Sequence, residues 1–151
     1  MKLLAGYDPI IAQWVGERLK HVGSGEAFGP CQAIGVTDDL GTEILAGAVY
    51  HGFHPEYRSI EMSFAASNPA WCQRGIVTAL MSYPFGQLRC RRVTAVVAEK
   101  NRRALRLNQA LGFRREGCVR RGFGNQNAII MGMLAKEWNE SKFNTLKKEY
   151  A

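Results

Sequence analysis

The sequence lacks any apolar run close to the roughly 20 residues that a helix needs to cross a bilayer. Its start, Met1-Lys2-Leu3-Leu4, leads directly into Gly6 and Asp8 without the apolar core of a signal peptide. No Cys-x-x-Cys pair is present, which disfavours a zinc site or a disulfide framework. The cysteines are expected to be free buried thiols: Cys31, Cys72, Cys90 and Cys118. These absences predict a cytoplasmic protein that does not insert into a membrane.

Metal ligands are also scarce. His51 and His54 form a lone His-x-x-His with no acidic or cysteine ligand beside it, so no metal site is predicted. Repeats, low-complexity segments and an interdomain linker are absent as well, and 151 residues suit one domain over 1–151 with a single core.

Acidic residues are scarce between positions 89 and 121, where 2 Asp and Glu stand against 11 Lys and Arg. The net charge of +7 therefore belongs largely to one segment. Such a segment suits an anionic partner: a phosphorylated cofactor, nucleic acid or an acidic protein surface. For any single arginine, a solvated helix face is the better explanation. Because no nucleic-acid motif is present and aromatics are missing until Phe113, nucleic acid is the disfavoured partner.

The chain is organised around a strand, a turn and a helix that begin in this segment. Residues 93–97 are rich in valine, as in a buried strand, and a helical pattern follows from Asn101. The apolar positions of that helix share one face: Ala104, Leu107 and Leu111. Asn101 and Asn108 lie on the same face, where a polar group needs a partner. A helix N-cap accounts for Asn101 but not for Asn108. Gly112 ends the helix.

The other elements follow from periodicity and turn residues. Further strands are predicted at 2–7, 31–36, 44–50, 59–66 and 128–134, and helices at 9–23, 71–81 and 135–150. Asp8-Pro9 is typical of an N-cap followed by proline at the first helical position. Pro84 is expected to kink or break its helix. Strand 59–66 alternates apolar residues with Glu61 and Ser63, so one of its faces is polar.

Several short motifs resemble the C-terminal half of the GNAT superfamily of acyl-CoA-dependent N-acyltransferases, nearest to its ribosomal-protein acetyltransferase branch. They are Asn101 with Ala104, Leu111-Gly112-Phe113, Glu116-Gly117, Arg120, the strand 129–134 and Glu137-Trp138. Tyr83-Pro84-Phe85 resembles short phage-borne chains of this kind. The resemblance implies an α/β fold with a central, mostly antiparallel sheet, one splayed parallel strand pair and flanking helices.

The resemblance also implies acetyl-CoA as co-substrate. In the family, a Gln/Arg-x-x-Gly-x-Gly/Ala loop cradles the pyrophosphate with amides at a helix N-terminus, where the helix dipole attracts anions. Gly75 matches the first glycine, while Cys72 and Val77 depart from the motif; alone, Gly75 is typical of a plain turn. The implied cofactor-binding residues are Phe64, Ala65, Ala66, Gln73, Arg74, Gly75, Ile76, Val77, Thr78, Asn101 and Arg106.

By the same resemblance, the catalytic candidates are Glu61, Asn101 and Asn108. Glu61 matches a glutamate that acts as the base toward the amine, although a surface carboxylate paired with an arginine explains it equally well. A bulge in strand 59–66 is expected to aim an amide near residues 64–66 at the thioester carbonyl. Asn108 stands where the family carries a tyrosine as general acid, but a thiol can leave as the thiolate.

The predicted function is transfer of an acetyl group from acetyl-CoA to a primary amine by direct attack. The amine belongs to a protein N-terminus, a lysine or a small molecule. Val77 and Asn108 keep an alternative open, a catalytically impaired protein of this fold that binds and regulates a protein partner. The oligomeric state, including a homodimer, stays open. No metal and no second cofactor is implied.

Overall fold

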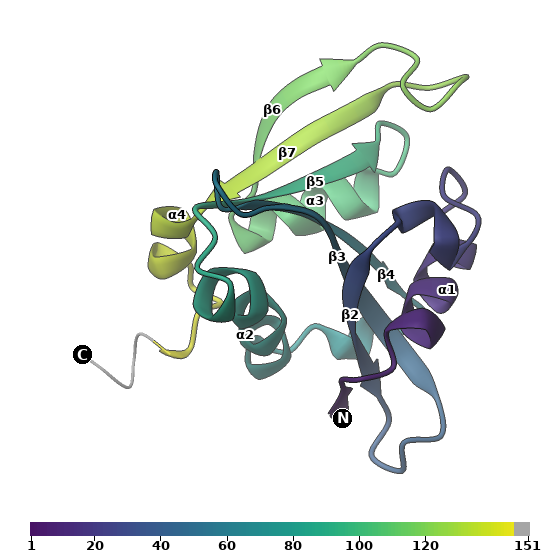
Figure 1. Cartoon of the computed structure of the whole chain (residues 1–151), viewed down its shortest axis with the longest axis vertical. Coiled ribbons are helices and arrows are strands. Elements are labelled where there is room, and N and C mark those ends of the chain that lie inside the picture. Colours follow the sequence, from purple (N-terminus) through teal and green to yellow (C-terminus); the bar gives the residue numbers. More distant parts are fainter. Residues whose placement is uncertain (147–151) are drawn as a thin grey trace.

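A computed structural model describes residues 1–146 and shows a twisted mixed sheet with helices on both faces (Figure 1). The strand order is β1-β2-β3-β4-β5-β7-β6. The strands are β1 Lys2–Leu4, β2 Cys31–Thr37, β3 Ile44–His54, β4 Ser59–Ala66, β5 Arg92–Ala98, β6 Arg114–Val119 and β7 Ala128–Leu134. All neighbouring pairs are antiparallel except β4 and β5, which run parallel. The predicted fold class is therefore confirmed.

The helices follow the expected order. They are α1 Asp8–Arg18, α2 Arg74–Ser82, α3 Arg102–Leu111 and α4 Ala135–Glu140, with short 3₁₀ turns η1 Gly25–Phe28 and η2 Pro69–Trp71. Gly112 ends α3 in the left-handed conformation at φ 118°, as predicted. The helix expected over 135–150 reaches only Glu140, and its last part, 147–150, lies outside the described residues.

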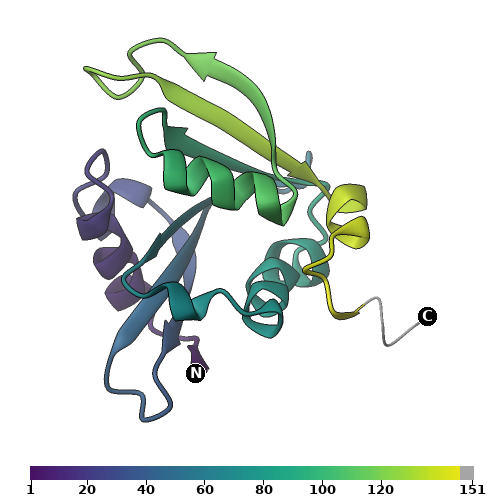
Figure 2. The same ribbon diagram turned by 180° about the vertical axis from the view of Figure 1, so that it is seen from behind.

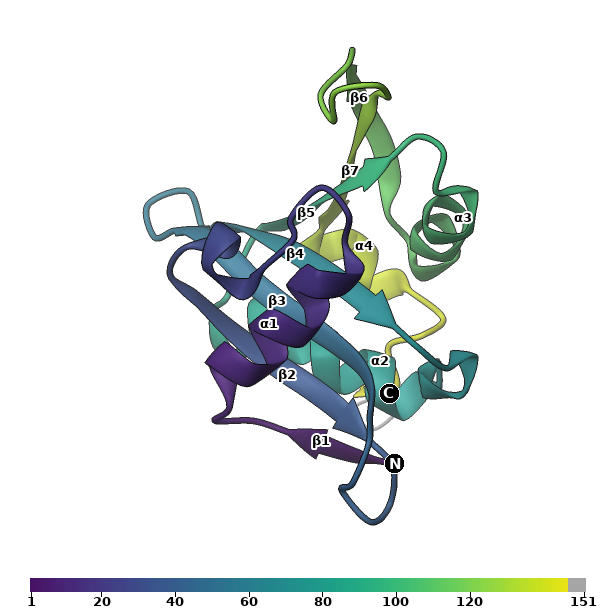
Figure 3. The same ribbon diagram turned by 90° about the vertical axis from the view of Figure 1, so that its right-hand side faces the viewer.

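Two apolar clusters lie on opposite faces of the sheet. On one face α1 packs on β2 and β3 through Ile11 and Val15, which are fully buried (Figure 3). On the other face α2, α3 and α4 join β3, β4, β5 and β7 in the larger cluster, and α3 covers β5 in the view from behind (Figure 2). The alternation of β4 serves both faces, because Phe64 joins the larger cluster and Ala65 the smaller one.

The α-helix α2 ends at Ser82, two residues before Pro84, so the predicted local break is confirmed. The chain continues from α2 into a π-helical segment, η3 Tyr83–Gln87, in which the Leu88 amide donates to the Tyr83 carbonyl at 3.0 Å. Proline has no N–H for the Leu80 carbonyl four residues earlier, and the buried Tyr50 hydroxyl donates to that oxygen at 2.7 Å. A side chain from β3 thus takes the place of the missing helix donor.

Several local predictions are wrong. Asp8 is not an N-cap: its carboxylate accepts from the Ala33 amide at 2.7 Å, which ties α1 to β2, and α1 ends at Arg18 rather than near residue 23. Strand β3 continues past residue 50 to His54. Strand β6 is an additional edge strand whose mostly exposed, arginine-rich sequence gives no apolar alternation. Among the four free cysteines only Cys90 is buried.

Candidate functional site

The parallel strands β4 and β5 pair over only three positions. Ser59, Ile60 and Glu61 face Arg92, Val93 and Thr94 in register, and no further pairs follow. Beyond Glu61 the two strands separate, so the β5-facing edge of β4 from residue 62 to 66 has no strand partner. Backbone amides on that edge can therefore point into the opening between the strands.

A cavity of about 670 Å³ occupies this opening. Its walls on the α2 and α3 side are apolar and include Phe64, Trp71, Val77, Leu80, Leu107 and Phe113. On the α1 side it is lined by the end of α1, by Ser63 and by the loop between β6 and β7. The cavity therefore lies between the separated strands and has lining residues on both faces of the sheet. A long thin ligand on one face can meet a second molecule on the other.

The start of α2 lies beside this cavity, since Val77 in its first turn lines the wall. The Val77 amide donates to the Gln73 carbonyl at 2.9 Å. The amides of Arg74, Gly75 and Ile76 make no hydrogen bond within the described part of the chain. Free amides at a helix N-terminus favour anions, and here Arg74 and Gly75 are exposed.

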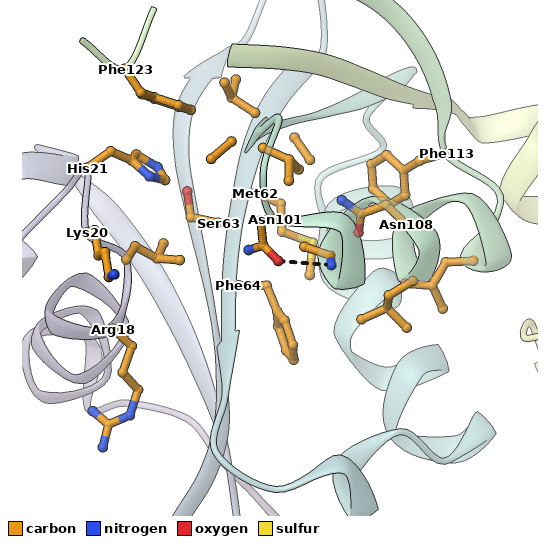
Figure 4. A pocket seen from close by; sticks show the side chains of 18 of the residues that line it. Arg18, Lys20, His21, Met62, Ser63, Phe64, Asn101, Asn108, Phe113 and Phe123 are labelled. Carbon is orange, nitrogen blue, oxygen red and sulfur yellow. Dashed lines mark hydrogen bonds between the residues drawn. The ribbon is translucent and has the colours of Figure 1, made fainter. Parts of the chain in front are cut away.

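Both asparagines of α3 line the cavity (Figure 4). Asn101 is the N-cap of α3, because its Oδ1 accepts from the Ala104 amide at 3.2 Å. Its Nδ2 makes no hydrogen bond among the described residues and can serve a ligand. The Nδ2 of Asn108 contacts Met131 Sδ at 3.8 Å, a weak acceptor. The polar groups that the sequence placed on the apolar face thus lie at the cavity wall.

Glu61 does not line the cavity. Its carboxylate lies 3.4 Å from His51 Nδ1 on the neighbouring strand, and not beside an arginine. The other ring nitrogen, His51 Nε2, lies 2.9 Å from Ser63 Oγ, and Ser63 does line the cavity. Burial lowers the pKa of His51, and the Glu61 carboxylate partly opposes that shift.

The charge around the cavity is positive. Among the described residues that line it there is no Asp or Glu, whereas Arg18, Lys20 and Lys100 all contribute. His21 also lines the cavity and stacks on Phe123 with ring centroids 4.0 Å apart. Burial lowers the pKa of His21, which favours its neutral form. The positive charge therefore comes from the arginine and the two lysines.

The structure brings together only some of the site residues predicted from the sequence. Phe64, Val77, Asn101 and Asn108 line the cavity. The others do not: Glu61, Ala65, Ala66, Gln73, Arg74, Gly75, Ile76, Thr78 and Arg106. Of these, Arg106 is exposed and Ala65 is buried under α1. The Thr78 hydroxyl donates to the Phe143 carbonyl at 2.7 Å and thereby holds the C-terminal segment.

The predicted bulge is also in a different place. Strand β4 keeps regular register with β3 from residue 61 to 66, so no bulge lies at Phe64 to Ala66. The irregularity lies in β3 between His51 and His54, where Gly52 has φ 62°. Strand separation, and not a bulge, leaves the amides of β4 free at the cavity.

Sequence reasoning did not single out Ser63 or the contacts of His51 with Ser63 and Glu61. Ser63 shares the polar face of its strand with Glu61, and that alternation was a usable signal. The contacts of His51 with Glu61 and Ser63 could be predicted only from the register of β3 on β4, which no local sequence pattern provides.

Comparisons with known proteins place the fold. No family model and no curated protein matches the sequence. Among solved structures, dodecameric spermidine N-acetyltransferase from Vibrio cholerae is 16% identical, with 91% of this chain and 95% of that chain covered at a TM-score of 0.72. A T. thermophilus protein provisionally described as an acetyltransferase is 21% identical, with 81% of this chain and 67% of that chain covered at a TM-score of 0.64.

These neighbours are GNAT-fold acetyltransferases, and the present chain has the same fold, with its one parallel pair at β4 and β5. The earlier resemblance is therefore confirmed at the level of fold. No helix within residues 1–146 is long and apolar enough to cross a membrane. In that same range, no group of three or more His, Cys, Asp or Glu side chains is arranged to hold a metal ion.

Proposed function

We propose that the protein is an N-acetyltransferase that moves an acetyl group from acetyl-CoA to a primary amine by direct attack. The observation that carries this proposal is the separation of β4 from β5 beyond Glu61, which opens a cavity of about 670 Å³ between the two strands. Acetyl transfer to an amine is also the activity named for the Vibrio cholerae neighbour.

Acetyl-CoA suits the residues present. Its pyrophosphate would lie on the free amides of Arg74, Gly75 and Ile76, which need no side chain to bind an anion. Val77 replaces a glycine of the family motif, but its side chain is 2% exposed and packs in the core, away from that amide surface. The pantetheine arm would follow the apolar cavity wall, with the Nδ2 of Asn101 as a polar contact.

The acceptor amine would enter from the α1 face. A polyamine is a poor match there, because the cavity has no acidic lining residue in the described chain and carries Arg18, Lys20 and Lys100. Like charges at close range disfavour a polycation. We therefore propose an acceptor whose amine lies near a neutral or anionic group, such as the N-terminus of an acidic protein.

Two assays test this function. The first is a thermal shift with acetyl-CoA. Ligand at a hundredfold its dissociation constant should stabilise the protein by about 2.7 kcal/mol, which corresponds to about 5–10 °C for a chain of this size. Pantetheine, which lacks the phosphates, is the matched control and should give a much smaller shift. No shift with acetyl-CoA would contradict the proposal.

The second assay measures CoA release with an acidic peptide and with spermidine as acceptors. The peptide should have the higher kcat/KM, and Lys20→Glu should reduce that preference while Lys136→Glu, an exposed change on α4, should not. Faster acetylation of spermidine would refute the acceptor class. Binding of acetyl-CoA without turnover of any amine would instead favour the alternative, a binding or regulatory protein that has lost catalysis, consistent with Asn108 in place of an acidic hydroxyl.

A further inference from the structure

Three side chains form a continuous polar connection from the solvent to the cavity. The Glu61 carboxylate lies 3.4 Å from His51 Nδ1, and His51 Nε2 lies 2.9 Å from Ser63 Oγ. The side chains of His51 and Glu61 are 15% and 49% exposed, so the connection runs inward from a half-exposed carboxylate. At its inner end Ser63 lines the cavity just where β4 and β5 have separated.

The order of the three groups determines which of their atoms carry protons. The negative charge of an ionised Glu61, 3.4 Å from His51 Nδ1, favours the tautomer of His51 with the proton on Nδ1. Nε2 is then the acceptor, and the Ser63 hydroxyl donates to it. The serine oxygen is left with lone pairs that can accept a proton from a molecule in the cavity.

Register and a local irregularity of β3 build this arrangement. His51 lies directly opposite Glu61 in the antiparallel pair, and Ser63 lies two residues further along the same face of β4. Gly52, in the left-handed region, follows His51 at the irregular part of β3. Such irregularities commonly direct a neighbouring side chain toward a site.

We propose that Ser63 receives the proton of the acceptor amine and passes its own proton to His51, with Glu61 holding the imidazole in place. This inference rests on the proposed acetyl transfer and adds to it the route of the proton. Ser63 is the catalytic residue of the three, because it alone lines the cavity, and His51 and Glu61 are positioning residues behind it. In this proposal Glu61 positions His51, whereas the resemblance implies that Glu61 itself is the base.

The protons and bonds balance as follows. The acceptor arrives as an ammonium ion and loses one proton through Ser63 to His51 Nε2, which leaves a neutral amine. The amine nitrogen attacks the thioester carbonyl, and a C–N bond forms. The C–S bond then breaks, and the second amine proton goes to the departing thiolate to give free CoA. His51 returns its proton to solvent, and no oxidant or other co-reactant is required.

The surroundings of His51 suit a base that works near neutral pH. Cys31 of β2 and Glu61 of β4 are the titratable groups opposite it on the neighbouring strands. From η1, Phe28 packs against the imidazole with ring centroids 5.2 Å apart, while Glu26 is exposed. Burial lowers the pKa of His51 and so keeps its ring neutral to lower pH, and Glu61 limits that shift.

The test measures kcat against pH at saturating acceptor for the full chain and for matched variants. Activity of the wild type should fall as His51 gains a proton on acidification. Ser63→Ala and His51→Gln should each lower kcat about 100-fold or more at neutral pH, the range typical of general-base catalysis. Ser63→Thr keeps the hydroxyl and should restore most of the activity. The affinity for acetyl-CoA should stay unchanged in all of them, which separates catalysis from folding.

Glu61→Gln should change the pH dependence of kcat, which would stay the same if Glu61 only stabilised the fold. Loss of the carboxylate lowers the pKa of His51 further, so the acidic limb of the profile should shift to lower pH. His54→Gln is the control on the same strand, since His54 stacks on Tyr57 and does not line the cavity.

Two results would overturn the relay alone. One is that the wild type is active and His51→Gln keeps both the same kcat and the same fall of kcat at low pH. Loss of both in a His21→Gln variant would strengthen that result. The other is an acetyl group found on Ser63 by mass spectrometry after incubation with acetyl-CoA. A wild type that binds acetyl-CoA but acetylates no amine would remove the proposed function itself, and the relay with it.

Discussion

Replacing Arg74 by proline should remove one cofactor contact without disturbing the fold. Arg74 is the first residue of α2, and its amide makes no hydrogen bond in the described part of the chain. The preceding residue, Gln73, has φ −110° and ψ 146°, the extended conformation that a residue before proline prefers. Proline is also well tolerated at the first position of a helix.

The expected loss of affinity follows from a single charge-assisted hydrogen bond. An amide that donates to a phosphate oxygen contributes about 1.5–3 kcal/mol, so the Kd for CoA should rise about 10- to 150-fold in Arg74→Pro. Arg74→Ala is the matched control, because it removes the exposed guanidinium but keeps the amide. An exposed charge contributes about 1 kcal/mol or less, so this variant should lose about fivefold at most.

Isothermal titration with three ligands isolates the contact. The difference between Arg74→Pro and Arg74→Ala should appear with CoA, persist with 3′-dephospho-CoA, which keeps the pyrophosphate, and vanish with pantetheine. Urea unfolding should give similar stabilities for the two variants. Equal Kd values of the two variants for CoA would refute the placement of the pyrophosphate on this helix.

Two further predictions concern stability. Tyr50→Phe leaves the buried Leu80 carbonyl without its donor and should lower the free energy of unfolding by about 1–3 kcal/mol, measured with urea. Adding Pro84→Ala supplies an amide for that carbonyl and should recover part of the loss. Additive effects of the two substitutions would contradict this explanation. Gly16→Ala should cost about 1–3 kcal/mol, because the new Cβ meets backbone atoms of Ser24; Gly75→Ala meets nothing within 4 Å and should be neutral or slightly stabilising.

Much of the fold was predictable because its signals are local. The valine-rich strand β5, the two-faced helix α3 and the glycine that ends it are each encoded within a few residues, and the structure has all three. The separation of β4 and β5 was implied by resemblance and is confirmed. Strand β6 escaped prediction, since it is an exposed edge strand whose residues satisfy no apolar pattern.

The site was less predictable because it depends on long-range register. Asn101 and Asn108 were recognisable as polar groups on an apolar face, and both line the cavity. The partner of Glu61 was not recognisable, because His51 lies ten residues earlier and on another strand. The positive lining combines the end of α1 with Lys100, two segments that only the tertiary fold brings to one cavity.

The three-position pairing of β4 with β5 has a mechanical consequence. Only these few backbone contacts join the two halves of the sheet directly, and the apolar cluster in which α2 packs also contains residues from both halves. We expect a core truncation such as Leu80→Ala to change the width of the opening between the strands. Turnover should then change although the side chains of the proposed relay are left intact. Hydrogen exchange at the amides of Val93 and Thr94 would report this coupling between sheet geometry and catalysis.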